Sequence, residues 1–177
     1  MKSLLFTSEM VQTILAGKKT QTRRIFKDVY FKTKYTQGDI LYVRENFAKV
    51  GDRIFYKADN NDIENAGLKG MYNFKWTPSI YMPQALSRIA IKITDLRVER
   101  LQNISAIDVE REGVKTKQTE KGILYDMAGC GFFTFIPETA YYYLWNKING
   151  VDSHLLNPLV YVITFEVLEH APAAYNR

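Results

Sequence analysis

The chain has 177 residues, of which 46% are hydrophobic and 24% are charged. This composition is typical of a globular domain and excludes a disordered or fibrous protein. One cysteine and two histidines exclude an intrachain disulfide and predict neither a metal site nor another cofactor. No apolar run is long enough to span a bilayer, and the N-terminal segment turns polar at Thr7, so we expect a cytoplasmic protein without a membrane partner.

The net charge of +5 is concentrated in one segment. Between Lys18 and Lys34 the chain has seven basic residues and a single acid, Asp28, which gives +6, whereas the other residues sum to −1. A segment of this kind is typical of a surface that binds phosphate or another anion. Solvated surface side chains produce the same pattern, so the charge alone leaves both interpretations open.

The first elements are a short strand at residues 4–6 and a helix that follows it. Ser8 is predicted to be the N-cap of this helix, and Gly17 is predicted to end it. A turn at residues 37–39 then precedes a buried strand at residues 40–43, which is rich in β-branched and aromatic side chains.

The segment at residues 19–25 has little apolar content. It is predicted to be an exposed or cleft-lining strand. Because side chains alternate between the two faces of a strand, Thr20, Thr22 and Arg24 are expected to share one face.

The middle of the chain combines a loop, a strand and a short helix. A polar loop is predicted near residues 58–70 and is followed by an extended aromatic segment. Alternating isoleucines predict a strand over residues 89–98. Ser105 and Asp108 form a capping-box pattern for a short helix that Gly113 ends.

The last part of the chain begins with a second loop near residues 115–131, in which a hairpin is an option. Pro137 suits the first position of a helix, and apolar residues at helical spacing extend this helix to Gly150. An alternating pattern predicts a final strand over residues 159–167, and residues 171–177 are expected to be frayed.

These elements contain several short strands and few helices, without a repeating βα unit. They favour an α+β fold in which short helices flank a small mixed or antiparallel β-barrel. We expect a single domain over residues 1–170, with insertion loops near residues 58–70 and 115–131. The motifs of the common nucleotide-binding, phosphoryl-transfer, serine-hydrolase and zinc-protease folds do not occur.

Several motifs together resemble the ASCH domain, a family of PUA-like barrels. Residues 14–24 (Ile-Leu-Ala-Gly-Lys-Lys-Thr-Gln-Thr-Arg-Arg) are followed by a Gly-Asp strand entry within residues 37–43, and residues 104–113 resemble the family's short helix with an acid before its glycine. Residues 76–83 and 157–163 resemble the longer ASCH proteins that phages and prophages encode. The resemblance covers most of the chain and implies a barrel that binds RNA or a modified nucleoside.

The resemblance also implies an enzymatic activity. Some small bacterial ASCH proteins are amidohydrolases that remove the acetyl group from N4-acetylcytidine with a Lys, a Thr and a Glu. The matching positions here are Lys19, Thr22 and Glu112, and Glu110 is an alternative for the acid. In these roles the threonine is the nucleophile, the lysine is its base, and the glutamate orients the lysine or handles the proton of the leaving amine.

This assignment sets a geometric condition. Residues three apart in a strand point to opposite faces, so Lys19 and Thr22 can converge only if Lys19 lies in the turn after Gly17. Further residues that we expect to bind the substrate or RNA are Lys18, Thr20, Arg23, Arg24, Arg44 and Glu45.

Two other functions stay open at this point. One is a non-catalytic RNA-binding module with the same fold. The other is a phage assembly or host-interaction factor, which is suggested only by the likeness to phage-encoded proteins. The sequence leaves the oligomeric state undecided.

Overall fold

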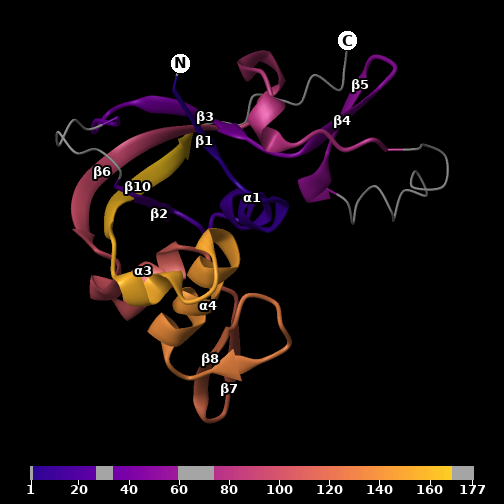
Figure 1. The fold of residues 1–177 in the computed structure, drawn as a ribbon. Coiled ribbons are helices and arrows are strands. Elements are labelled where there is room, and N and C mark those ends of the chain that lie inside the picture. Colours follow the sequence, from indigo (N-terminus) through magenta and orange to yellow (C-terminus); the bar gives the residue numbers. More distant parts are fainter. Residues whose placement is uncertain (1, 27–33, 60–73, 169–177) are drawn as a thin grey trace. The chain divides into compact units, whose positions relative to one another are not determined.

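The computed structural model describes residues 2–26, 34–59 and 74–168, and the account below concerns these residues (Figure 1). The strands are β1 (Lys2–Leu5), β2 (Gln21–Ile25), β3 (Ile40–Arg44), β4 (Phe47–Val50), β5 (Arg53–Tyr56), β6 (Ala90–Arg100), β7 (Thr116–Thr119), β8 (Gly122–Asp126), β9 (Phe133–Thr134) and β10 (Leu159–Leu168). The α-helices are α1 (Ser8–Leu15), α3 (Ala106–Arg111) and α4 (Pro137–Asn149). Short 3-10 helices are η1 (Lys57–Asp59), η3 (Ser79–Tyr81), η4 (Gln84–Leu86), η5 (Leu101–Asn103) and η6 (Ser153–Leu156).

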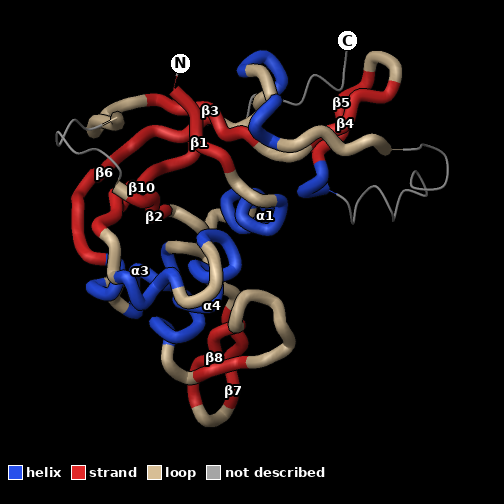
Figure 2. Tube along the Cα trace, in the orientation of Figure 1, coloured by secondary structure: helices blue, strands red, loops and turns tan. Residues whose placement is uncertain are grey.

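The fold is mixed α+β, as predicted, with few helices beside several sheets (Figure 2). The largest sheet has the strand order β1-β3-β6-β10-β2; β1 is parallel to β3, whereas β3 with β6 and β10 with β2 are antiparallel. Closing this sheet into a barrel would require its edge strands β1 and β2 to pair. No closed barrel is found within the described ranges.

The chain divides into two compact units. The first comprises Met1–Gly17, Gly38–Ile93 and Glu166–Arg177, and the second comprises Lys18–Gln37 and Thr94–Phe165. Most of the loop predicted near residues 58–70 lies outside the described residues, as does the predicted tail. In the part of the chain that is described, no helix is long and apolar enough to cross a membrane.

The first unit contains α1, whose cap differs by one residue from the prediction. The hydroxyl of Thr7, not that of Ser8, accepts a hydrogen bond from the backbone N–H of Met10 at 3.3 Å. Thr7 has extended backbone angles, as an N-cap requires, while Ser8 is already helical. Gly17 follows the helix at a φ of +68°, a left-handed conformation that glycine adopts without strain, which agrees with the predicted end.

The second unit contains the longest helix, α4, and most of the residues discussed below. Pro137 occupies its first turn and Gly150 follows its end, both as predicted. Ser105 caps α3 by accepting from the N–H of Asp108 at 3.2 Å, which confirms that half of the capping pattern. The segment after α3 forms a β7–β8 hairpin, the option that the sequence left open.

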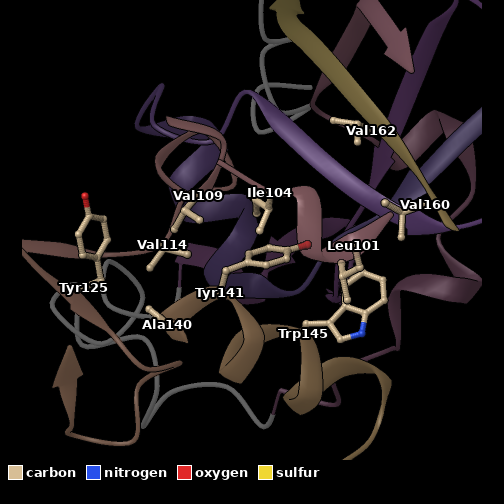
Figure 3. Packing of buried hydrophobic residues seen from close by; sticks show 10 residues of the cluster. All are labelled: Leu101, Ile104, Val109, Val114, Tyr125, Ala140, Tyr141, Trp145, Val160 and Val162. Atoms are coloured by element: carbon tan, nitrogen blue, oxygen red, sulfur yellow. The ribbon is translucent and has the colours of Figure 1, made fainter. Parts of the chain in front are cut away.

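The core of the second unit joins α3, α4 and β10. Its buried residues are Leu101, Ile104, Val109, Val114, Tyr125, Ala140, Tyr141, Trp145, Val160 and Val162. Figure 3 shows the side chains of Tyr141 and Trp145 reaching from α4 into this cluster. Burial of the apolar faces of α3 and α4 therefore fixes both helices beside β2 and β10.

Candidate functional site

A buried ionic cluster lies where the chain enters β2, and all its members belong to the second unit. Lys19 precedes the strand, because β2 begins only at Gln21. The N–H of Thr20 donates to the carbonyl of Arg111 at 2.9 Å, and the carbonyl of Thr20 accepts from the N–H of Phe165 at 2.8 Å. Lys19 is therefore anchored between the end of α3 and β10, in the position after Gly17 that the geometric condition required.

Lys19 and Glu112 form the centre of the cluster. The lysine side chain is fully buried, and its Nζ donates to the backbone carbonyl of Glu112 at 2.7 Å and to its Oε2 at 2.8 Å. Glu112 is the C-cap of α3 and is only 3% exposed. A carboxylate there opposes the helix dipole, so the lysine offsets both the side-chain charge and an unsatisfied carbonyl of the helix end.

Arg23 extends the cluster to two further acids. Its Nη2 donates to Glu99 Oε1 at 2.7 Å and to Asp108 Oδ2 at 2.8 Å. Its Nη1 donates to Gln21 Oε1 at 2.8 Å and to Glu112 Oε1 at 3.3 Å. The guanidinium therefore touches every carboxylate of the cluster.

Arg97 supports the same acids from β6. It donates through Nη2 to Asp108 at 2.8 Å and through Nε to Glu99 at 3.1 Å. Arg23 Nε is buried and has no hydrogen-bond partner among the described residues, and its guanidinium carbon lies 5.8 Å from the ring centre of Tyr141. The three acids are thus divided among three cations, Lys19, Arg23 and Arg97.

Burial shifts the protonation equilibria of the cluster in different directions. It lowers the pKa of Lys19, because the loss of hydration outweighs the attraction of Glu112, and Arg24 and Arg23 add to the shift. Burial is the main cause that raises the pKa of Tyr141 well above its ordinary value, and the negative charge of Glu112 adds to it. Burial alone would raise the pKa of Asp108, but the contacts with Arg23, with smaller contributions from Gln21 and Arg97, together outweigh burial and lower it.

Thr22 lies on the other face of β2 from Arg23. Its side chain is fully buried, and its hydroxyl accepts from Arg24 Nη1 at 2.7 Å. The same Nη1 donates to the carbonyl of Arg23 at 3.0 Å. The hydrogen bond between Thr22 and Arg24 agrees with the predicted shared face of these two residues, whereas Thr20 precedes β2. Gln21, Thr22 and Arg23 are buried, so the first part of this strand is not exposed.

The structure distinguishes the two candidate acids by their contacts. Glu110 is exposed and accepts from the hydroxyl of Tyr125 at 3.1 Å. Glu112 is the acid that meets Lys19. Because the glutamate that the resemblance implies orients the lysine, it must hydrogen-bond to it, and Glu112 is therefore the better match.

The other predicted binding residues are dispersed. Lys18 is exposed beside the cluster, and Thr20 is half-buried. Arg44 and Glu45 belong to the first unit, where Arg44 lies over the ring of Tyr42 and Glu45 is bound by Arg88. Their participation in one site with Lys19 stays a prediction.

Sequence reasoning missed four members of the cluster. Gln21, Glu99 and Arg97 were not among the predicted site residues. Arg97 and Glu99 are two residues apart in β6 and therefore share one face, and this spacing could have indicated an ion pair. Asp108 was assigned to a capping box, whereas its carboxylate binds Arg23 and Arg97. No group of three or more histidines, cysteines or acids within the described ranges is arranged to hold a metal ion.

Comparison of the chain with protein-family models, with curated proteins and with solved structures finds no match. The geometry of the cluster and the motif resemblance are therefore the grounds for a functional assignment.

Proposed function

We propose that this chain is an ASCH-type domain with a PUA-like barrel that binds RNA or a modified nucleoside and hydrolyses N4-acetylcytidine to cytidine and acetate. The observation that carries the proposal is the buried contact of Lys19 with Glu112, 93 residues apart in the sequence. The resemblance implies both residues as catalytic. Their contact supports the residue-by-residue match, since a chance match would not require them to meet.

Amide hydrolysis needs a hydroxyl, which Thr22 supplies, and a base, which Lys19 of the cluster supplies. Because Thr22 lies on the opposite face of β2 from Arg23, the reaction requires the hydroxyl and the amine to be brought together in the substrate complex. The neutral amine of Lys19 accepts the proton of Thr22 as Thr22 Oγ1 bonds to the acetyl carbon. The resulting tetrahedral intermediate collapses, the bond from the acetyl carbon to N4 breaks, and N4 takes the proton from Lys19. Water then hydrolyses the acetyl ester of Thr22, which releases acetate and restores the hydroxyl.

The electrostatics of the cluster favour these roles. Because burial lowers the pKa of Lys19, a larger fraction of this amine is neutral near physiological pH than of an ordinary lysine. Glu112 orients the amine through its carboxylate and carbonyl. Arg24, which donates to Thr22, is placed to stabilise negative charge that develops on the acetyl oxygen.

Lys19 and Thr22 have no exposed surface in this structure. The reaction therefore requires a movement that admits the substrate. The same burial favours a second candidate, a binding module in which the cluster is only a framework.

The test is conversion of N4-acetylcytidine to cytidine by purified protein, followed by chromatography. We expect turnover by the wild type, loss of about 10²- to 10⁴-fold in Lys19→Met, and little change in Lys49→Met, which alters an exposed lysine of the first unit. Thr22→Ser keeps a hydroxyl and should retain part of the activity that Thr22→Val loses. A wild type that converts neither the nucleoside nor acetylated RNA contradicts the hydrolase.

The binding module predicts a different pattern. Protein without turnover should still bind RNA, with an affinity that falls as salt increases, because bound phosphates release their counterions. Absent or salt-independent binding would count against the module.

A further inference from the structure

The three-stranded sheet β7-β8-β9 of the second unit ends in an exposed aromatic segment. Phe132, Phe133 and Phe135 are 70%, 48% and 55% exposed. Large apolar side chains that gather on a surface mark interaction sites more often than isolated ones do. The Lys19 cluster does not use these residues.

The strand register places lysines on the same face as Phe133. Phe133 pairs with Asp126, and Leu124, two residues earlier in β8, pairs with Lys117. Paired residues share a face, and so do residues two apart in a strand, so Phe133, Leu124 and Lys117 point the same way. The opposite face carries Tyr125, which is buried in the core, so the face with Phe133 and Lys117 is the outer one.

This outer face carries Lys115 and Lys117 together with one acid, Asp126, which pairs with Phe133 and lies opposite Lys115. Within the described ranges, no ion pair involves the exposed lysines Lys115, Lys117 and Lys121. Lys115 continues the face beyond Lys117, since its carbonyl accepts from the N–H of Asp126 at 2.8 Å. The carboxylate of Asp126 instead accepts from the N–H of Gly129 at 2.9 Å.

A further cation lies at the turn that leads to Phe132. Lys147 of α4 donates to the carbonyl of Ala128 at 3.1 Å. The N–H of Met127 donates to the carbonyl of Phe132 at 3.0 Å, which closes the turn. Exposed rings and lysines thus occur together in and beside the small sheet β7-β8-β9, which lies below α4 in Figure 1.

We infer that the outer face of β7-β8-β9 binds a single-stranded RNA segment. The ring of Phe133 lies on this face, and the exposed rings of Phe132 and Phe135 flank β9 in the chain. These rings stack on bases, and Lys115 and Lys117 contact phosphates. Any base presents a π face, so this contact is tolerant of sequence, while a polyanion complements the unpaired lysines better than an apolar protein surface does. The inference rests on the RNA-binding part of the proposed function and adds a second contact surface outside the Lys19 cluster.

The test is binding of a fluorescein-labelled 12-nucleotide uridine oligomer, measured by anisotropy at several salt concentrations. The double variant Phe133→Ala/Phe135→Ala should weaken binding by about 5- to 100-fold. Lys115→Gln/Lys117→Gln should reduce the slope of log affinity against log salt by about 1.4. The matched control is Leu155→Ala/Leu156→Ala, which removes two exposed side chains of η6 in the same unit and should leave affinity unchanged.

Equal affinity of the phenylalanine variant and the wild type overturns the inference, as does the absence of any binding. A wild-type dimer by light scattering that the phenylalanine variant converts to a monomer also overturns it, because the face would then join two copies of the chain. Hydrolysis of the free nucleoside is measured on the same variants. If the phenylalanine variant retains hydrolysis and binds RNA as tightly as the wild type, only this RNA-binding surface is rejected. If the wild type does not hydrolyse the nucleoside but the phenylalanine variant binds RNA more weakly than the wild type, only the hydrolase is rejected.

Discussion

Each unit of the molecule contains an arginine that binds more than one acid, and the two arrangements differ. Arg88, in the first unit, forms two bonds with Glu45 at 2.8 and 3.0 Å and two with Asp59 at 2.7 and 2.8 Å. Its guanidinium lies 4.1 Å from the ring centre of Tyr56. Arg23, in the second unit, shares its acids with other cations and leaves its Nε unpaired among the described residues.

Burial disfavours the charged form of one group in each cluster, and the neighbouring charges modify the shift. Around Arg88, two carboxylates share one cation, and burial raises the pKa of Glu45 despite its bonds to Arg88. Around Arg23, burial lowers the pKa of Lys19 despite the attraction of Glu112, and the nearby charges of Arg24 and Arg23 lower it further. In the first cluster an arginine binds a buried carboxylate, whereas the second cluster contains an amine with a lowered pKa, which favours a role as a base. We therefore assign structure to the first and chemistry to the second.

The largest expected effect is on the Arg88 cluster. Arg88→Met keeps most of the side-chain volume but leaves Glu45, which is 1% exposed, without its cation. Breaking a buried pair by removing one partner costs about 3–5 kcal/mol of unfolding free energy. Urea denaturation measures this cost, and Arg88→Lys should recover only part of it because an ammonium cannot form two bidentate pairs. A loss below about 1 kcal/mol would contradict a structural role.

A smaller effect separates Glu112 from its neighbour Glu110. Glu112→Gln should reduce hydrolysis of N4-acetylcytidine about 10²-fold, equivalent to about 2.7 kcal/mol of transition-state stabilisation, because the amide orients Lys19 less well. The matched control Glu110→Gln changes an exposed acid that contacts Tyr125 and should leave kcat within about twofold. If Glu112→Gln and Glu110→Gln lost the same amount of activity, the contact of Glu112 with Lys19 would have no role in catalysis.

The two capped helices provide a matched pair with a smaller effect. Thr7→Ala removes the cap of α1 in the first unit, and Ser105→Ala removes the cap of α3 in the second. Each should cost about 1 kcal/mol in thermal or urea unfolding. Ser105→Ala should in addition reduce hydrolysis, because α3 carries Asp108 and Glu112. If Ser8→Ala proved more costly than Thr7→Ala, the cap position would be wrong.

The smallest effect is on the pH dependence of stability. Because the pKa of Lys19 is lowered on folding, the unfolded chain binds a proton between that lowered pKa and 10.5 that the folded chain does not. The stability of the wild type relative to Lys19→Met should therefore rise as pH rises through this window and be constant below it. Urea unfolding of both proteins at a series of pH values measures the difference, and a relative stability that falls with pH would show that the pKa is raised.

The local elements were largely predictable from the sequence, and the contacts of the cluster were not. Capping, glycine and proline signals located α1, α3 and α4, because such signals act within one turn of helix. The error at Thr7 arose because threonine and serine are adjacent and both suit an N-cap. The predicted barrel is not found among the described residues, since alternation indicates strands but not which edges pair.

Only those residues of the candidate site that belong to a motif resembling the family could be predicted from the sequence. Lys19, Thr22 and Glu112 followed from the resemblance, and the structure brings Lys19 into contact with Glu112, while Thr22 contacts Arg24. The acids Glu99 and Asp108 bind Arg23 across 76 and 85 residues, a separation on which local periodicity carries no information. Tyr141 is buried on α4, and no pattern in the sequence indicates that the charge of Glu112 acts on its hydroxyl.

The most direct test of the assigned chemistry is an NMR titration of the Lys19 side-chain nitrogen or its adjacent carbon in the intact protein. We predict that Lys19 titrates below the ordinary range of lysine. Glu112→Gln should lower its pKa further by removing an attracting charge, and Arg23→Gln should raise it by removing a repelling one. A Lys19 that titrates at or above the ordinary lysine value in the wild type would contradict the account, because the amine would then be a structural cation like Arg88.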